Sequence, residues 1–330
     1  MSKQIPPFTI SNKMLELVAA ISEKVGQISS HKELQAKPQL RKNNRIRSIH
    51  SSLKIEANSL SLSKVWDVIN GQPVLGDWKE IQEVKNAYNA YEKVEKIDPF
   101  SILELKKLHG IMTYKTVEES GEFRLGDEGV FSGDECIFVA PPPYMVPELM
   151  KNLFDWMKKY KTQVHPLIMA AVFHYEFVFI HPFSDGNGRM ARLWHTALLY
   201  NWREIFAYIP LESQIEKFQN EYYDAIATCH VNGNSDVFIE FILAQIDQIL
   251  DTVITQVSAT EVYTSEYVKR LLGCMEYDVP YTANALMEQL GLKSKETFRK
   301  NYMNPALAQG FVKRTLPDKP NSRNQRYVKQ

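Results

Sequence analysis

Apolar residues recur every three or four positions along most of the chain, which predicts a mainly helical protein. Two helix starts are marked by Asp77 and Ser101, each followed three residues later by Glu in the spacing of a capping box. Residues 166–180 are apolar almost throughout, as expected of a buried central helix. The other long helices expected from the spacing cover residues 14–28, 40–56, 78–94, 147–160, 189–200, 211–230 and 237–257.

Two segments depart from helical spacing. Residues 121–143 are rich in glycine and β-forming residues and end in three prolines, a pattern that predicts a β-hairpin. From about residue 261 the pattern is that of a helix, a short turn, a second helix and a two-stranded wing. We therefore expect an all-α main domain with one hairpin, followed by a small domain of winged-helix type.

The composition is that of an ordinary globular protein, and the 330 residues correspond to about two domains. Lys and Arg number 39 and Asp and Glu also number 39, so the whole molecule has no general attraction to nucleic acid or anionic membranes. Residues 261–330 are locally basic, with twelve Lys or Arg against seven Asp or Glu. Any such attraction would be confined to this C-terminal segment.

The sequence favours a cytoplasmic protein without membrane contact. No apolar stretch reaches the length of about 20 residues that spans a bilayer. The first ten residues also lack the apolar core of a signal peptide. Cys136, Cys229 and Cys274 lie far apart in the sequence, which suits buried thiols in a reducing compartment.

The most informative run is HPFSDGNGRMAR at residues 181–192, between the apolar helix and the next one. Gly186 and Gly188 flank Asn187 and let the backbone approach a ligand closely. The free amide groups at the start of the following helix point into the same space with the positive end of the helix dipole. The run therefore predicts an anion-binding loop.

The side chains of this run extend the prediction to a polyphosphate. Arg189 and Arg192 lie three residues apart on one helical face and can present two guanidinium groups to phosphate oxygens. Asp185 offers a hard oxygen ligand for Mg²⁺. His181 is the group of the loop whose ordinary pKa suits proton abstraction near neutrality. The alternative is a structural loop with a core histidine, but several compatible features within twelve residues favour a site.

These residues resemble the Fic family, whose motif is His-Pro-Phe-x-Asp/Glu-Gly-Asn-Gly-Arg-x-x-Arg and is matched here at every specified position. The resemblance extends over most of the chain, including a C-terminal winged helix of the sort that many bacterial Fic proteins carry. It implies a Fic-type helical core and transfer of AMP from ATP to a Ser, Thr or Tyr hydroxyl of a protein. The implied partners are therefore ATP, with magnesium, and a target protein.

The resemblance also implies a role for each motif residue. His181 would be the base that activates the target hydroxyl, and Asp185 would hold Mg²⁺. Asn187, with Gly186 and Gly188, would form the anion hole for the α-phosphate.

By the same resemblance, Arg189 would hold the β-phosphate and Arg192 the γ-phosphate. Near the adenine, Tyr222 and Tyr223 are candidates for an aromatic wall, with core packing as the alternative for either ring. Of the two we prefer Tyr223.

An upstream run, SLKIEAN at residues 52–58, resembles the inhibitory motif Ser/Thr-x-x-x-Glu-Gly/Asn of one Fic class. Ser52 and Glu56 lie four apart on one helical face. The resemblance implies that Glu56 pairs with Arg192 and so denies the γ-phosphate its guanidinium. Ala57 departs from the motif, and Asn58 follows one position later. The alternative is an ordinary solvated glutamate on a helix.

The resemblance divides the chain into three parts. Residues 1–100 would be an N-terminal helical region with the inhibitory motif, residues 101–258 the catalytic core, and residues 261–330 the winged-helix domain. The hairpin at residues 122–139 lies where Fic proteins have a flap that pairs with the backbone of the target. A stabilising surface hairpin without a partner is the alternative.

Two classes of function remain open on the sequence. The first is an autoinhibited protein adenylyltransferase, or an enzyme that uses the same site to remove AMP with Glu56 positioning a water. The second is a DNA-binding regulator that uses the basic winged helix at residues 261–330, which could equally contact a protein. The sequence leaves open the target, which could be the protein itself, and whether the chain forms a homodimer.

Overall fold

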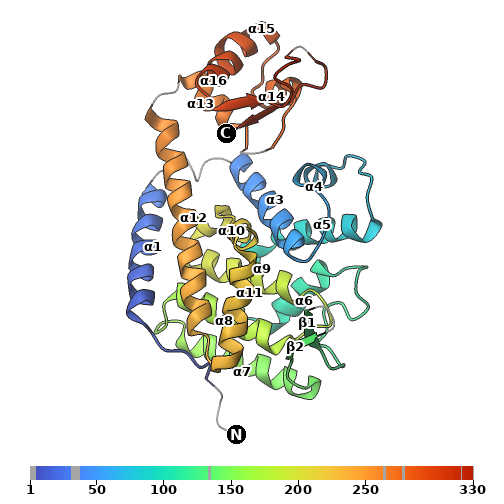
Figure 1. Ribbon diagram of the computed structural model, residues 1–330, viewed down its shortest axis with the longest axis vertical. Helices are drawn as coiled ribbons and strands as arrows, with labels where there is room; N and C mark the ends of the chain where they lie inside the picture. The colour runs from blue at the N-terminus through green and yellow to red at the C-terminus, as the bar shows by residue number, and fades with distance from the viewer. Residues whose placement is uncertain are drawn as a thin grey trace. The chain divides into compact units, whose positions relative to one another are not determined.

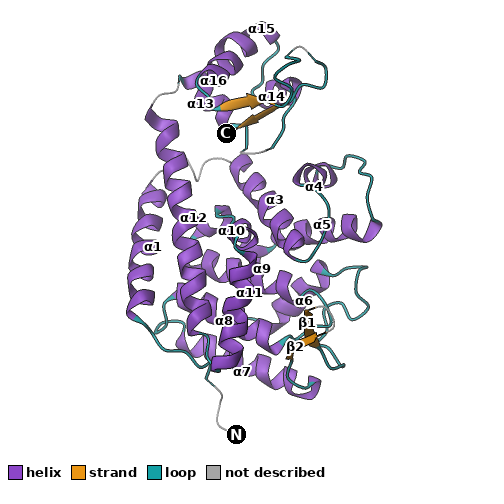
Figure 2. Ribbon diagram, viewed as in Figure 1, coloured by secondary structure: helices purple, strands orange, loops and turns teal. Residues whose placement is uncertain are grey.

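The computed structural model describes residues 5–30, 38–132, 135–262, 265–276, 279–320 and 322–329, and it is mainly helical (Figures 1 and 2). The chain divides into two compact units. The first consists of Met1–Gln27 and Arg45–Leu250, and the second of Ile28–Asn44 and Asp251–Gln330. None of the helices in the described part is long and apolar enough to cross a membrane.

The helices up to residue 262 follow the predicted order. They are α1 (Asn12–Ser30), α3 (Pro38–Ile55), α4 (Leu62–Ile69), α5 (Trp78–Tyr91), η1 (Val94–Lys96), α6 (Ile102–Met112), η2 (Pro143–Met145), α7 (Val146–Tyr160), α8 (Pro166–Ile180), α9 (Asn187–Trp202), η3 (Glu204–Tyr208), α10 (Leu211–Lys217), α11 (Gln219–Asn232) and α12 (Asp236–Val262). The helix expected at residues 211–230 is broken at Phe218, which has a non-helical φ of −115° and ψ of 43°.

Both predicted capping residues are confirmed. The Asp77 carboxylate accepts from the amide of Lys79 at 2.7 Å, and the Ser101 hydroxyl accepts from the amide of Glu104 at 3.3 Å. Each bond satisfies an amide at the first turn of a helix, where the backbone offers no partner. On the apolar face expected of α5, Val84 and Tyr91 are buried, Ile81 and Tyr88 are partly exposed, and Trp78 at the start is 66% exposed.

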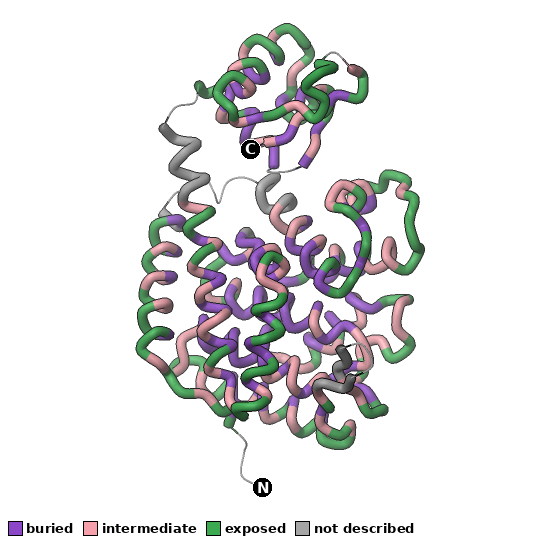
Figure 3. The backbone as a smooth tube through the Cα atoms, in the orientation of Figure 1, coloured by how far each residue is buried: buried purple, intermediate pink, exposed green. Residues whose placement is uncertain are grey.

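The core of the first unit is built around α8 and α9, which pack against each other (Figures 1 and 3). The prediction that residues 166–180 form a buried helix is confirmed. Phe173 of α8 lies against Trp194 of α9 with ring centroids 6.2 Å apart, and both side chains are fully buried. This rigid pair fixes the loop that joins the two helices, residues 181–186.

The predicted hairpin is present as β1 (Gly129–Ser132) and β2 (Glu135–Val139), which pair antiparallel (Figure 2). Gly129 pairs with Val139, and the register shifts between Val130 and Phe131. The side chain of Cys136 lies outside the described residues, whereas Cys229 is buried and Cys274 is partly exposed.

The C-terminal part of the second unit has the predicted order of helix, turn, helix and two strands. Its elements are α13 (Glu266–Gly273), α14 (Ala283–Gln289), α15 (Lys295–Thr297), the π-helix η4 (Phe298–Met303), α16 (Asn304–Ala308), β3 (Val312–Arg314) and β4 (Tyr327–Lys329). The strands pair antiparallel, and Tyr281 forms a bridge to Tyr327 beside them. Fully buried side chains such as Leu286 and Phe298 give this part its own core.

Candidate active site

The loop between α8 and α9 begins and ends with a residue in the left-handed backbone conformation. His181 ends α8 with φ 50° and ψ 60°, and Gly186 precedes α9 with φ 81°. Glycine adopts this conformation readily, whereas a histidine there costs energy that the surrounding structure must supply. The strained residue is the predicted base.

Asn187 holds the loop in shape. Its Nδ2 donates to the carbonyl of Phe183 at 2.7 Å, and its Oδ1 accepts from the amide of Phe183 at 3.0 Å. The side chain is buried and both ends of its amide are occupied, so it can offer little to a ligand directly. The amides of the first turn of α9 remain as donors for an anion.

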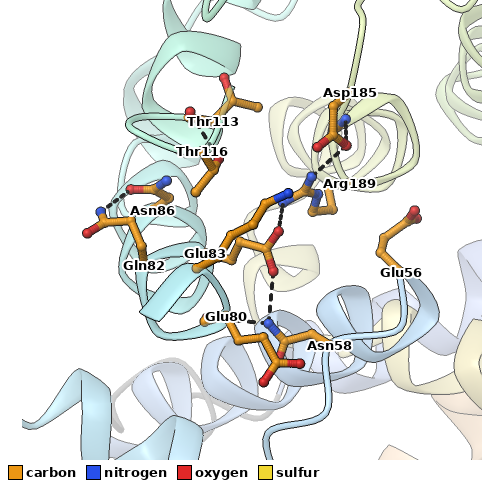
Figure 4. A network of polar contacts seen from close by, with 12 residues as sticks. Glu56, Asn58, Glu80, Gln82, Glu83, Asn86, Thr113, Thr116, Asp185 and Arg189 are labelled. Carbon is orange, nitrogen blue, oxygen red and sulfur yellow. Dashed lines mark hydrogen bonds and ion pairs between the residues drawn. The ribbon is translucent and has the colours of Figure 1, made fainter. Parts of the chain in front are cut away.

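Arg189 and Asp185 form an ion pair at this helix start (Figure 4). Nη2 of Arg189 lies 2.8 Å from Oδ1 of Asp185, and Nη1 lies 3.3 Å from Oε1 of Glu83 on α5. The arginine is buried, while the side chain of Asp185 is 44% exposed. Glu83 was not predicted, because the sequence offers no sign that α5 faces the motif.

Glu83 connects this pair to the end of the upstream motif (Figure 4). Its Oε2 accepts from Nδ2 of Asn58 at 2.9 Å, and the same Nδ2 donates to the carbonyl of Glu80 at 3.3 Å. Ser59 adds two bonds to the Glu80 carboxylate, from its amide at 2.6 Å and from its hydroxyl at 2.8 Å. The segment after Glu56 is thereby fixed on α5.

The structure brings Ser52 and Glu56 to Arg192, and of these two contacts the resemblance implied the one with Glu56. Nε of Arg192 donates to Oγ of Ser52 at 3.0 Å, and Nη2 donates to the carbonyl of Ser52 at 3.0 Å and to Oε1 of Glu56 at 2.6 Å. Burial lowers the pKa of the guanidinium most, but the Glu56 carboxylate, together with Tyr222 and Tyr91, raises that pKa by more, so it lies above its ordinary value. Arg192 is therefore a buried cation held by the carboxylate of Glu56.

The Glu56 carboxylate lies directly over the start of α9. A Cβ built at Gly188 would lie 2.3 Å from Oε1 of Glu56 and 3.2 Å from Nη1 of Arg192. Only glycine leaves room for the carboxylate at this position. The space beside the helix terminus that would accept an anion therefore holds an acidic side chain.

His181 is held neutral by its surroundings. Burial lowers its pKa most, the Arg124 guanidinium lowers it further, and the backbone of Val178 and the carboxylates of Glu56 and Asp185 act in the opposite direction. Its Nδ1 lies 3.3 Å from the carbonyl of Val178. A neutral imidazole is the form that can accept a proton.

His109 on α6 supports the loop and was not predicted. Its Nδ1 accepts from the amide of Gly121 at 2.9 Å, so the proton of the neutral ring resides on Nε2, which lies 2.9 Å from the carbonyl of Asp185. Its ring stacks on Phe183 at a centroid distance of 3.6 Å. Burial lowers the pKa of His109 to about 4, which keeps this arrangement intact at neutral pH.

The two tyrosines considered for the adenine have different environments. The ring of Tyr222 is in the core, with its hydroxyl 2.9 Å from Nε2 of His174. Tyr223 is 46% exposed, and its pKa is raised by burial and by the nearby Glu56 carboxylate. Of the two, Tyr223 is therefore available to a ligand near Glu56.

A magnesium site would depend on the nucleotide. Among the described residues, no group of three or more His, Cys, Asp or Glu side chains could hold a metal ion by itself. The partly exposed carboxylate of Asp185 fits a cation that takes most of its ligands from phosphate and water.

A helix amino terminus with two buried arginines and a histidine at its entrance has the chemistry of an anion-binding site. The Fic/DOC family model matches residues 99–199, and the model of the C-terminal domain of Fic-like proteins matches residues 266–328. A crystal structure of a Fic family protein from Desulfovibrio desulfuricans is 39% identical, covers 99% of this chain and 98% of that chain, and superposes with a TM-score of 0.74. The chain belongs to the Fic family.

Further relatives confirm the helical Fic fold and name an activity. A Fic domain-containing signalling protein from Bacteroides thetaiotaomicron shares the fold with a TM-score of 0.59 at 19% identity, over 75% of this chain and 98% of that chain. The proteins called protein adenylyltransferase Fic from Aedes aegypti and Drosophila willistoni are 29% and 27% identical over 62% and 71% of this chain. The chain spans only 41% and 47% of the length of these two relatives.

Proposed function

We propose that the protein transfers AMP from ATP to a hydroxyl group of a target protein and that Glu56 inhibits the transfer. The observation that carries the proposal is the junction of α8 and α9, where His181 and Asp185 precede a helix start with two buried arginines. The names of the Aedes and Drosophila relatives support the same activity. The expectation of a cytoplasmic location remains a prediction.

In the proposed reaction His181 removes the proton from the target hydroxyl, and the hydroxyl oxygen attacks the α-phosphorus of ATP. The bond from the α-phosphorus to its bridging oxygen breaks, and pyrophosphate leaves. The amides at the start of α9 stabilise the negative charge that develops on the α-phosphoryl oxygens. Mg²⁺ bound with the nucleotide, held by Asp185 and phosphate oxygens, would neutralise further charge.

Glu56 would inhibit by competing with phosphate for Arg192. The carboxylate lies 2.6 Å from Nη2 of Arg192 and covers Gly188, so a γ-phosphate at this arginine would have to displace it. The hairpin β1–β2 would supply an edge for the backbone of the target. The target, which could be a second copy of this chain in a homodimer, is left open.

The proposal is tested by AMP incorporation from α-labelled ATP. We expect Glu56→Gly to raise incorporation, including modification of the protein itself. His181→Ala in that background should lower incorporation by about 10²–10⁴-fold while ATP binding survives. Arg192→Ala should be inactive, and adding Glu56→Gly should restore little, since both changes act through one contact. Equal rates for the wild type and Glu56→Gly would remove the case for inhibition.

The reverse reaction is a second use of the same site. Here Glu56 would orient a water that attacks the AMP group of a modified protein. Removal of AMP from a pre-modified target by the wild type, lost in Glu56→Gly, would favour this direction. Incorporation by Glu56→Gly with no removal by the wild type would count against it.

Exposed basic residues favour a nucleic-acid contact as an additional function of the second unit. Lys295, Arg299 and Lys300 are exposed on α15 and η4, the second helix of the predicted winged helix. A mobility shift of duplex DNA that weakens with salt, and that is lost in Lys295→Ala/Arg299→Ala, would support this contact. An unshifted duplex at low salt would exclude it.

A further inference from the structure

Arg124, between α6 and β1, is a charged side chain that the proposed reaction has not used. It is only 2% exposed. Its guanidinium donates to four backbone carbonyls: Nε to His181 at 2.6 Å, Nη1 to Gly126 at 2.7 Å, and Nη2 to Pro141 at 2.5 Å and to Ile180 at 3.4 Å. Each acceptor is an uncharged backbone carbonyl, so Arg124 ties segments of backbone together; we call these four bonds the backbone clamp.

One side of this clamp fixes the backbone of the proposed base. The side chain of Arg124 binds the carbonyls of Ile180 and His181, and its own amide donates to the carbonyl of Pro182 at 3.0 Å. Three consecutive carbonyls around His181 therefore bind one residue. Because φ and ψ of His181 are set by the peptide groups on either side, these bonds hold its left-handed conformation and the direction of its imidazole.

The position also suits a cation on electrostatic grounds. The carbonyls of Ile180 and His181 are at the carboxyl end of α8, where the helix leaves acceptors without intrahelical partners. The partial negative charge at such an end attracts a guanidinium. The same positive charge lowers the pKa of His181, where burial acts in the same direction and the carboxylates of Glu56 and Asp185 act against it.

The other side of the clamp holds the two feet of the hairpin. Gly126 precedes β1 and Pro141 follows β2, and Arg124 binds the carbonyls of both. The feet are also joined by the amide of Ala140, which donates to the carbonyl of Glu128 at 3.0 Å. A force on the feet of the hairpin, such as that of a docked strand, can therefore reach His181 through Arg124.

We infer that Arg124 is the positioning residue of the base: it holds His181 in its left-handed conformation and connects that conformation to the hairpin. The inference rests on the proposed function, in which His181 is the base. It predicts that loss of the clamp impairs proton removal more than ATP binding, because the phosphate loop is held separately by Asn187. A general loss of structure would impair both.

The test compares Arg124→Met and Arg124→Lys in the Glu56→Gly background. We expect Arg124→Met to lower kcat for AMP transfer by about 10²-fold, the effect of a small misplacement of a reacting group, with KM for ATP within about twofold. Arg124→Lys keeps the charge but not the fork, and should recover part of the rate. Arg45→Met is the matched control, since Arg45 is a mostly buried arginine that pairs with Glu92 and Glu95 away from the site.

A titration of His181 by NMR, with its signal assigned by loss in His181→Gln, gives a readout without turnover. The pKa of His181 should rise in Arg124→Met, rise less in Arg124→Lys, and stay unchanged in Arg45→Met. An unchanged titration in Arg124→Met, or equal losses of kcat and ATP affinity in both Arg124 variants, would overturn the inference. If Glu56→Gly transfers no AMP, the proposed function fails, and a rise of the His181 pKa in Arg124→Lys, which keeps the charge, still decides whether Arg124 positions His181.

Discussion

At the scale of single residues, the backbone of Ala57 gives a physical reason for the glycine or asparagine that follows the glutamate in the motif that residues 52–58 resemble. Ala57 has a φ of 65°, in the left-handed region that these two residues adopt most easily. The turn is closed by the amide of Ala57 to the carbonyl of Lys54 at 3.0 Å and the amide of Asn58 to the carbonyl of Leu53 at 3.1 Å. This helix end places Glu56 beside Arg192, and the backbone of Ala57 within it is strained.

Relief of this strain should tighten inhibition. We expect Ala57→Gly to raise the free energy of unfolding by about 0.5–1 kcal/mol and to lower basal AMP incorporation, because Glu56 is then held without a conformational cost. Lys115→Gly is the control, since Lys115 has a φ of 64° and lies outside the inhibitory motif. It should stabilise the fold to a similar extent in urea without changing incorporation. A similar fall in both variants would contradict the link to Glu56.

The residues found from the sequence are those that lie close together along it. The run at residues 181–192 and the motif at residues 52–58 each place their groups within a few positions, so spacing alone predicts the loop and the shared helical face. Glu83, His109 and Arg124 reach the site over separations of 106, 76 and 57 residues. No local pattern distinguishes them from other charged residues, because only tertiary packing decides which side chains meet the loop.

At the scale of elements, one buried carboxylate joins α3 to three other helices. Glu212 of α10, 1% exposed, accepts from Oγ of Ser48 at 2.7 Å, from the hydroxyl of Tyr91 at 2.8 Å and from Oγ1 of Thr196 at 3.2 Å. Ser48 is on α3, the helix that leads to Glu56. The position of Glu56 therefore depends in part on a polar cluster that joins α3 to α5, α9 and α10.

Removal of this carboxylate should both destabilise the protein and weaken inhibition. Glu212→Ala leaves three buried hydroxyls without their acceptor, and we expect a loss of about 2–3 kcal/mol in the free energy of unfolding with a rise in basal incorporation. Glu216→Gln is the control for the same pair of helices, because Glu216 pairs with the exposed Lys54. It should cost less than about 1 kcal/mol. A lower free energy of unfolding without any rise in AMP incorporation would show that Glu212 does not support the proposed inhibition.

Element order was predictable because amphipathic spacing and capping residues are local. The interior of α8 and the caps of α5 and α6 follow from it directly. The break at Phe218 was not predictable, since the apolar spacing of α10 continues into α11. The exposure of Trp78 was not predictable either, because it depends on which other elements pack against the start of α5.

At the scale of the whole molecule, buried neutral histidines make the fold sensitive to acid. His174 and His195 face each other in the core with ring centroids 5.4 Å apart. Burial lowers the pKa of His195 to about 3 and that of His174 well below its ordinary value of 6.5. Below pH 6.5 these two histidines bind protons in the unfolded chain but not in the folded core. The free energy of unfolding must therefore fall as the pH falls.

We expect the free energy of unfolding to decline from about pH 6.5 downwards, by at most about 1.4 kcal/mol per pH unit for each histidine. Burial raises the pKa of Glu176 to about 7, which gives a dependence of the opposite sign between pH 4.5 and 7. Urea unfolding at several pH values should therefore show a steeper acid loss in Glu176→Gln and a shallower one in His195→Leu. Parallel curves for all three proteins would refute this assignment.

The way in which Asn187 closes the loop also bears on chemical ageing. An asparagine followed by glycine deamidates through attack of the glycine nitrogen on the side-chain carbonyl, and the chain has such pairs at Asn70, Asn187 and Asn232. Asn70 and Asn232 are exposed, whereas both ends of the Asn187 amide are bound to Phe183 and its backbone is helical. Folding therefore protects the pair whose conversion would introduce a carboxylate at the proposed phosphate site. Time spent unfolded would therefore expose Asn187 to deamidation at the proposed active site.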